Sequence, residues 1–212
     1  MVEPKLIIYD CDGVLFDSKE ANEAFYNHIL RHFNMPPLRK DQLEFVHVST
    51  AKGAIDYLFQ SSPLKDKAKA FLKDVDNTPF IPLLRLEPNV RDVLEYLRPD
   101  HYTAIATNRG HSMPLIMKAY GLESLFDMVV TTLDVENPKP HPECLFKVLG
   151  RFKTKPQESL YIGDSEIDRL VSDSAGIPFA SYKNANLKAS YYFIDHLDLL
   201  KVLPSKNREV VK

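Results

Sequence analysis

The stretch YDCDGVLFDS, from Tyr9 to Ser18, follows the apolar run Leu6-Ile7-Ile8 and stands where a buried strand is expected to end. Two aspartates, Asp10 and Asp12, flank a cysteine there, and Gly13 permits a sharp turn. Alternate residues of an extended chain point to the same side, so both carboxylates are expected to face one site. Asp-x-Asp-Gly alone marks a turn more often than a catalytic pair, so the rest of the chain must decide.

The composition of the 212-residue chain is typical of a globular protein. Hydrophobic residues make up 44%, charged residues 26%, and the formal net charge is −2. This balance, with scattered Lys and Arg, gives no reason to expect nucleic acid or a membrane surface as a partner. The two cysteines lack zinc-type spacing, and no apolar stretch resembles a signal peptide or a membrane span. We expect a cytoplasmic protein, with a monomer as the default.

Short apolar runs alternate with helical patterns along most of the chain. Continuous runs of this kind suit parallel strands that are buried on both faces of a sheet. The expected strands are Leu6–Tyr9, Tyr102–Ala106, Met128–Val130, Leu160–Ile162 and Ile177–Ala180. Strands that alternate with helices predict an α/β fold with a doubly wound, Rossmann-like parallel sheet.

The segment from Ser18 to about Leu84 breaks this alternation. It has helical candidates without a convincing strand, and prolines then mark the return to the sheet. We therefore predict a Rossmann-like core of residues 1–16 and 86–212 and an inserted helical cap of residues 17–85. Ligands of α/β sheets bind beyond the carboxyl ends of the strands, so a cap inserted there is expected to be a lid.

Polar residues follow several predicted strands, and the carboxyl ends of parallel strands meet at one edge of the sheet. The residues expected at this edge are Asp10, Asp12, Thr107, Asn108, Asp164 and Asp168, with Lys139 on a loop. Clustered carboxylates normally need a cation, and a few oxygen ligands favour Mg²⁺. A helix start after Thr107 and the Lys139 ammonium would attract an anion. Together these features predict phosphoryl transfer, in which a carboxylate can be the nucleophile.

The motifs DxDGVLxDS, TN, the lysine of PKPHP and GDSxxD occur in this order between residues 10 and 168. They resemble the four motifs of the haloacid dehalogenase superfamily, and the helical insertion resembles the small cap of its phosphoglycolate phosphatase and β-phosphoglucomutase branch. The resemblance implies a Mg²⁺-dependent phosphatase that hydrolyses a small phosphorylated metabolite, a phosphate monoester, through an aspartyl-phosphate. Asp12 favours a C–O–P substrate, since dehalogenases of the superfamily lack this aspartate and phosphonatases usually have alanine.

The resemblance also implies the catalytic and metal-binding roles. Asp10 would attack phosphorus and carry the phosphoryl group. Asp12 would protonate the leaving oxygen and then deprotonate the hydrolytic water. Asp10, the main-chain carbonyl of Asp12 and the Asp164 carboxylate would bind Mg²⁺.

The phosphate-binding and supporting roles carry alternatives. Thr107, the backbone of Asn108 and Lys139 would bind the phosphate, while Gly13 and Asp168 would support the site. A Thr-Asn pair can also be an ordinary helix cap. Lys139 could be a solvated loop residue, and Asp168 could be a first-turn acid that the helix dipole favours.

A stretch between two predicted cap helices falls where relatives place a substrate-contacting loop. Its polar residues are His47, Ser49, Thr50 and Lys52. They could reach the leaving group when the cap closes; alternatively, Ser49 or Thr50 merely caps the next helix.

Three other positions are left open by the sequence. Arg109 and His111 follow the Thr-Asn pair and could lie near the mouth of the cleft or elsewhere on the surface. Relatives commonly have glycine where this chain has Asn89, and asparagine tolerates unusual backbone angles, so the turn can survive.

Two other functions stay open. A sugar phosphomutase could use the same scaffold, although no cap signature for a sugar bisphosphate is found. A catalytically silent binding or regulatory protein would be favoured by the loss of a motif residue, and Asp10, Asp12, Lys139 and Asp164 are all present.

Overall fold

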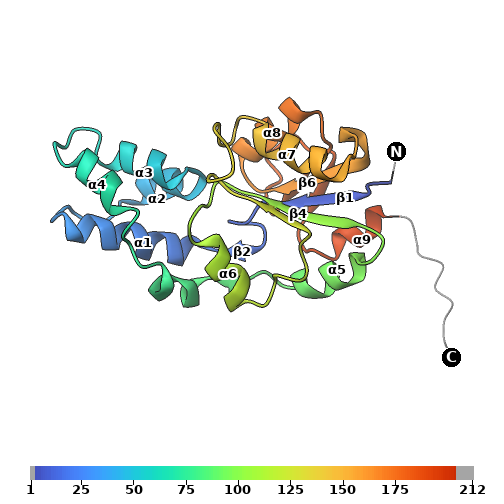
Figure 1. Ribbon diagram of the computed structural model, residues 1–212, viewed down its shortest axis with the longest axis horizontal. Helices are drawn as coiled ribbons and strands as arrows, with labels where there is room; N and C mark the ends of the chain where they lie inside the picture. Colours follow the sequence, from blue (N-terminus) through green and yellow to red (C-terminus); the bar gives the residue numbers. More distant parts are fainter. Residues whose placement is uncertain (1–2, 204–212) are drawn as a thin grey trace.

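In the computed structural model, which describes residues 3–203, a six-stranded sheet stands beside a group of four helices (Figure 1). The strand order is β5-β4-β1-β6-β7-β8, and every neighbouring pair is parallel. The strands are β1 (Leu6–Tyr9), β4 (Tyr102–Ala106), β5 (Met128–Val130), β6 (Ser159–Gly163), β7 (Phe179–Tyr182) and β8 (Tyr191–Phe193). The predicted α/β fold with a doubly wound parallel sheet is confirmed.

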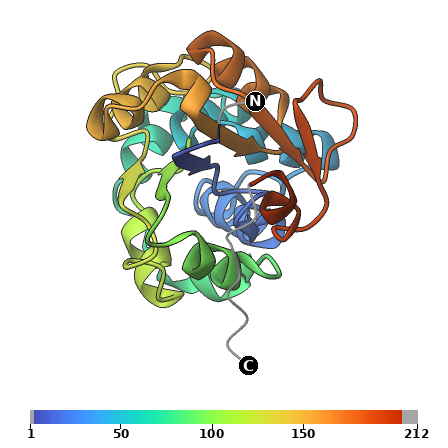
Figure 2. The ribbon, with the colours of Figure 1, turned by 90° about the vertical axis from the view of Figure 1, so that its right-hand side faces the viewer.

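Helices cover both faces of this sheet, on opposite sides in Figure 2. Ile7 and Tyr9 pack with α5 (Val90–Leu97), α6 (Met113–Ala119) and α9 (Asp198–Val202), whereas Leu6 and Ile8 pack with α7 (Glu143–Phe152) and α8 (Glu166–Ala175). All four β1 side chains are at most 1% exposed. Burial on both faces explains why the strands are apolar throughout and not alternating.

The four helices beside the sheet have a hydrophobic core of their own. They are α1 (Lys19–His32), α2 (Lys40–Val48), α3 (Ala51–Leu58) and α4 (Lys65–Phe71), followed by the 3₁₀ helix η1 (Thr78–Leu83). Tyr26, Ile29, Val46, Ile55 and Phe59 are buried in this core, which is separate from the clusters around the sheet. The four-helix group therefore folds around its own apolar contacts.

A two-stranded antiparallel ribbon joins the two parts of the chain. Its strands are β2 (Phe16–Asp17), where the chain leaves the sheet, and β3 (Arg85–Leu86), where the chain returns. The sequence did not predict this ribbon, because two residues are too few to show a strand period.

Several element boundaries differ from the prediction. The helix expected just after Thr107 begins only at Met113. The strand expected at Ile177–Ala180 begins at Phe179, since the Ile177 N–H bonds the Ser172 carbonyl at the end of α8 and Pro178 has no N–H. Strand β8 was not predicted. Residues 1–2 and 204–212 of the predicted core lie outside the described residues.

The turn before α5 confirms the expectation for Asn89. Its φ angle is 61°, in the left-handed region that glycine usually occupies. The Asn89 side-chain amide donates to the Asp195 carboxylate at 2.8 and 3.0 Å. This bond helps to hold asparagine in a conformation that few side chains adopt.

Candidate active site

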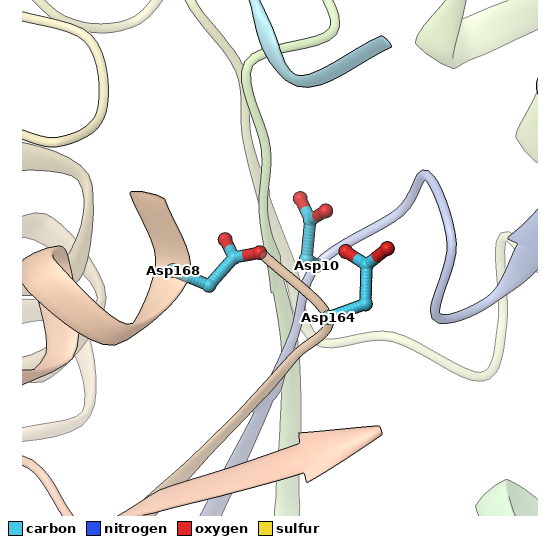
Figure 3. Close-up of side chains that lie close together, drawn as sticks. All are labelled: Asp10, Asp164 and Asp168. Carbon is cyan, nitrogen blue, oxygen red and sulfur yellow. The ribbon is translucent and has the colours of Figure 1, made fainter. Parts of the chain in front are cut away.

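The motif residues lie at the carboxyl ends of three adjacent strands. Asp10 follows β1, Thr107 follows β4, and Asp164 follows β6, and these strands are neighbours in the order β4-β1-β6. Asp168, on the first turn of α8, points toward the same place (Figure 3). The sheet topology thus brings together residues that are far apart in the sequence.

Lys139 is the centre of a buried hydrogen-bond network. Its Nζ donates to Asp10 Oδ1 at 2.7 Å, to Asp168 Oδ1 at 2.7 Å and to the Tyr161 hydroxyl at 2.8 Å. The lysine side chain is only 4% exposed, which excludes the alternative of a solvated loop residue. The ammonium is therefore fixed beside Asp10 with all three of its protons used.

Asp10, Asp164 and Asp168 form a cluster of three carboxyl groups, and Lys139 beside them supplies a single positive charge. One oxygen of each lies within 4.8 Å of the others. Burial raises the pKa of Asp164 to about 8, and the charges of Asp168 and Asp10 add to this. Burial also raises the pKa of Asp10, against the opposing effect of Lys139. Such a cluster is poorly stabilised without a further cation.

The donor set of this cluster fits a small divalent cation. Within residues 3–203 the Asp164 carboxylate has no hydrogen-bond or ion-pair partner, and Asp10 uses one oxygen for Lys139. Both Asp168 oxygens are bonded, to Lys139, Tyr161 and Ser165. Asp10 and Asp164 thus have oxygen atoms to offer a metal, whereas Asp168 orients Lys139 and caps α8.

Gly13 makes room for the Asp164 carboxylate. Its φ angle is 76°, which favours glycine, and a Cβ at this position would lie 2.0 Å from Asp164 Oδ2. A glycine is therefore required here both by the turn and by the neighbouring acid.

Asp12 is paired with Arg109. The Arg109 Nε donates to Asp12 Oδ2 at 2.9 Å, and a second guanidinium nitrogen donates to Oδ1. The two side chains are 15% and 14% exposed. Burial alone would raise the pKa of Asp12, but the Arg109 charge outweighs it and lowers this pKa to about 2. Asp12 is thus held as a carboxylate while it is paired with Arg109.

This pair continues into the four-helix group. Asn22 of α1 accepts from the Arg109 guanidinium at 3.0 Å, and its amide nitrogen lies 3.0 Å from His47 Nδ1 at the end of α2. Burial lowers the pKa of His47, which favours the neutral ring that can accept from the Asn22 amide. The four residues connect the sheet edge with the four-helix group.

Thr107 and Asn108 stabilise the loops around Lys139. The Asn108 side chain makes two bonds with the Lys139 backbone, at 3.0 and 3.2 Å, and the Thr107 hydroxyl accepts from the Arg109 N–H at 3.1 Å. Because the next helix starts at Met113, neither residue caps it, and the expected helix terminus beside Thr107 is a wrong prediction. Any anion here would meet loop N–H groups and Lys139.

A cavity of about 640 Å³ opens between the sheet edge and the four-helix group, and it is lined by Asp10 and Asp12. His47, Ser49, Thr50 and Lys52 line it from the other side. Thr50 also caps α3 by accepting from the Gly53 N–H at 3.0 Å, as the alternative interpretation predicted, and Ser49 donates to the Phe45 carbonyl at 2.8 Å.

Three residues at the site were not identified as candidates from the sequence. They are Arg109, whose position was left open, and Asn22 and Tyr161, which looked like ordinary helix and strand residues. Only the position of Arg109, directly after the Thr-Asn pair, indicated that it belongs to the same edge. The contacts of Asn22 and Tyr161 depend on the tertiary fold.

Comparison with known proteins gives a family match over most of the chain. The family model described as "Haloacid dehalogenase-like hydrolase" matches residues 7–182. A phosphoglycolate phosphatase from Mannheimia succiniciproducens is 29% identical over 94% of this chain and 98% of its own length. Pyrophosphatase PpaX from Bacillus mycoides is 27% identical, over 80% of this chain and 79% of its own length.

Solved structures agree with the fold. A haloacid dehalogenase superfamily hydrolase, subfamily IA, from Geobacter sulfurreducens has 37% identity and a TM-score of 0.77, and the match covers 95% of this chain and 97% of that one. A β-phosphoglucomutase from Clostridium difficile has a TM-score of 0.79 at 16% identity, over 94% and 93% of the two chains, so it shows similarity of fold alone.

Proposed function

Because the chain belongs to the haloacid dehalogenase-like hydrolase family, we propose that it is a Mg²⁺-dependent phosphatase that hydrolyses a small phosphorylated metabolite, a phosphate monoester, through an aspartyl-phosphate. The observation that carries this proposal is the position of Asp10, which lines the cavity beside both the Lys139 ammonium and the Asp164 carboxylate, the latter without a partner among residues 3–203. The relatives named above as phosphatase and pyrophosphatase support it.

Asp10 is the proposed nucleophile. One of its oxygens is fixed by Lys139 at 2.7 Å, which leaves the other free to attack phosphorus. Lys139 would also offset the charge of the incoming phosphate, and loop N–H groups at Thr107 and Asn108 would hold its oxygens. Asp168 and Tyr161 keep the Lys139 ammonium in place, because both contact Nζ.

Mg²⁺ would be bound by Asp10, by Asp164 and by the main-chain carbonyl of Asp12. When bound, this ion supplies positive charge that draws the phosphoryl oxygens and the two carboxylates together. Gly13 leaves the space that the Asp164 carboxylate occupies, so a side chain at that position would displace a proposed metal ligand.

Asp12 is the proposed general acid and base. It follows Asp10 by two residues and lines the same cavity, on the side of the four-helix group. A leaving oxygen would take its proton from the Asp12 carboxyl group, and the same carboxylate would then remove a proton from the hydrolytic water. In the arrangement described here Arg109 holds Asp12 ionised, so Asp12 must be released from Arg109 before it can donate a proton.

The division of the chain into a core, residues 1–16 and 86–212, and a cap, residues 17–85, belongs to this proposal. The separate apolar core of the four-helix group and the β2–β3 ribbon at its base support a lid that moves as a unit. His47, Ser49, Thr50 and Lys52 line the cavity from the cap, where they would contact the leaving group.

The alternatives have less support. A sugar phosphomutase shares the aspartyl-phosphate chemistry, but its resemblance to this chain is one of fold. A catalytically silent protein would have no need for the buried Asp10–Lys139–Asp168 network, which costs free energy to desolvate.

For partners and compartment, we propose a small phosphorylated metabolite as the ligand of a cytoplasmic monomer. No helix within residues 3–203 is long and apolar enough to cross a membrane. Both cysteines, Cys11 and Cys144, are free and buried, in keeping with a reducing compartment.

The test is a panel of phosphorylated metabolites assayed for phosphate release with Mg²⁺ and again with EDTA. We expect release from at least one compound, and its loss with EDTA. Chromatography of the products separates free phosphate from an isomerised sugar phosphate, which would favour the mutase. Absence of any turnover across the panel would contradict the proposed function.

A further inference from the structure

We propose that Arg109 determines specificity for a second anionic group on the substrate, and that this group replaces Asp12 as the partner of the guanidinium. The inference rests on the proposed function and extends it to the chemistry of the leaving group. The substrate would be a phosphate monoester or anhydride whose leaving group carries a carboxylate or a further phosphate.

Arg109 lies where the leaving group of a substrate must be bound. Asp12 can exchange a proton only with an oxygen that lies next to it, so the leaving group must occupy the cavity beside Asp12. Arg109 contacts both Asp12 oxygens and lines the same cavity. A leaving group therefore meets the guanidinium as soon as it reaches Asp12.

Only an anionic group can replace Asp12 as the partner of Arg109 without loss of charge pairing. The Asp12 and Arg109 side chains are 15% and 14% exposed, and Asp12 is the only carboxylate that pairs with Arg109 within residues 3–203, so a mostly buried arginine that loses it is left uncompensated. A hydroxyl group on the leaving group carries no charge and cannot replace the Asp12 carboxylate. A carboxylate or phosphate on the leaving group can accept hydrogen bonds from the planar Arg109 guanidinium in the same way as Asp12 does. An anionic leaving group thus frees Asp12 without leaving Arg109 unpaired.

The cap side of the cavity carries basic side chains. The basic cap residues that line the cavity are Lys52, Lys69, Lys73 and His47, of which Lys69 pairs with Asp56; Tyr26 is the other titratable cap residue there, and no carboxylate of the cap lines the cavity. Asn22 already holds the guanidinium at 3.0 Å from the cap side and contacts His47 in turn. This wall would attract a second negative charge and would leave Arg109 supported while its partner changes.

The experiment compares two probes that differ in one anion, phosphoglycolate and its amide, phosphoglycolamide. We expect the wild-type protein to prefer phosphoglycolate by about tenfold or more in kcat/KM, and Arg109→Gln to bring the ratio close to one. Arg109→Lys keeps the charge but loses the fork, so an intermediate ratio is expected. Arg151→Gln, at an exposed residue of α7, is the matched control and should keep the wild-type ratio.

Binding to Asp10→Asn protein, measured by calorimetry with the same two probes, gives the comparison without turnover. The expected result is tighter binding of phosphoglycolate that Arg109→Gln abolishes in this background. Equal kcat/KM for the two probes in the wild type, or an unchanged ratio in Arg109→Gln, would overturn the role of Arg109 while leaving the phosphatase intact. A third outcome is that no phosphate compound is turned over, while phosphoglycolate still binds more tightly than its amide. This outcome would contradict the proposed function but would support the role of Arg109 in binding the second anion.

Discussion

The cavity has a core wall, which includes Asp10, Lys139 and Asp164, and a cap wall, which includes His47, Ser49, Thr50 and Lys52. Lys139 is held by groups from distant parts of the chain, whereas Ser49 and Thr50 form hydrogen bonds with residues close to them in the sequence. The Lys139 partners include Asp10, 129 residues away, and Asp168, 29 residues away. Ser49 bonds a carbonyl four residues earlier, and Thr50 an amide three residues later. A change on the core wall therefore disturbs several elements, while a change at Ser49 or Thr50 stays local.

This difference corresponds to two proposed tasks. The core wall must keep a nucleophile, a cation and a proposed metal ligand in fixed relative positions, which needs buried and mutually bonded groups. The cap wall must contact whatever leaving group the substrate carries, and half-exposed side chains with local bonds can vary without loss of the fold. The following predictions test whether the two walls separate chemistry from specificity.

The largest effect is expected for Asp10→Asn, which removes the proposed nucleophile and keeps its shape. We expect kcat for phosphate release to fall by about 10⁴-fold or more, because the amide that replaces the Asp10 carboxylate cannot form the aspartyl-phosphate. The far-ultraviolet circular dichroism spectrum should be unchanged. Asp74→Asn, at an exposed residue after α4, is the control and should keep full activity; residual turnover above one per cent in Asp10→Asn would contradict the role.

Lys139→Met should damage both activity and stability. Removing the ammonium leaves Asp10 and Asp168 buried without their cation, so the free energy of unfolding in urea should fall by about 3–5 kcal/mol. Lys188→Met, at an exposed position, should cost little. A stability loss as small as that of the control would show that the network is less constrained than its geometry implies.

The metal site should link stability to pH through Asp164. Its pKa is raised to about 8 in the absence of a metal, so the folded state keeps a proton that the unfolded state has released, and stability falls as the pH rises from the ordinary value of 3.8 toward 8. Mg²⁺ replaces that proton, so its stabilising effect should be larger at about pH 8 than at about pH 6, and of order 2.7 kcal/mol at a hundredfold excess over Kd.

Thermal unfolding with and without Mg²⁺ at the two pH values measures this. Asp164→Asn should raise the midpoint of the metal-free protein at the higher pH, since it removes an unfavourable buried charge, and should reduce the Mg²⁺ effect. The same Mg²⁺ shift in the variant and the wild type would place the ion elsewhere.

The smallest effect is expected on the cap wall. Lys52→Ala should raise KM by a few-fold, about 1 kcal/mol or less, and leave kcat nearly unchanged, because an exposed lysine contributes little and its proposed contact is with the leaving group alone. Lys67→Ala, an exposed cap lysine that does not line the cavity, should change neither constant. A large fall in kcat for Lys52→Ala would break the separation between the two walls.

The sequence predicted the sheet, the motif edge and the helical insertion because each depends on a local pattern. Apolar runs indicated the strands, and parallel topology then brought Asp10, Thr107 and Asp164 to one edge. Even the left-handed turn at Asn89 followed from what asparagine tolerates. These are properties of short segments, which a single sequence displays.

The other features of the site depend on tertiary contacts, which cannot be inferred from any single segment of the sequence. The pairing of Arg109 with Asp12 joins residues 97 apart, and its extension to Asn22 and His47 requires the cap to lie against the sheet edge. Tyr161 looked like a strand residue, and only the fold shows its hydroxyl between Lys139 and Asp168. The helix expected after Thr107 was wrong because the loop continues to Met113.

The most direct test of the central claim is the mass of the protein in acid-quenched turnover with a substrate found in the panel. We predict that rapid quenching traps protein that is heavier by one phosphoryl group, that peptide mapping places this group on Asp10, and that the adduct is absent without Mg²⁺ and in Asp10→Asn. An active enzyme that never shows the adduct at any quench time, or shows it on another residue, would contradict the assignment of Asp10 as the nucleophile.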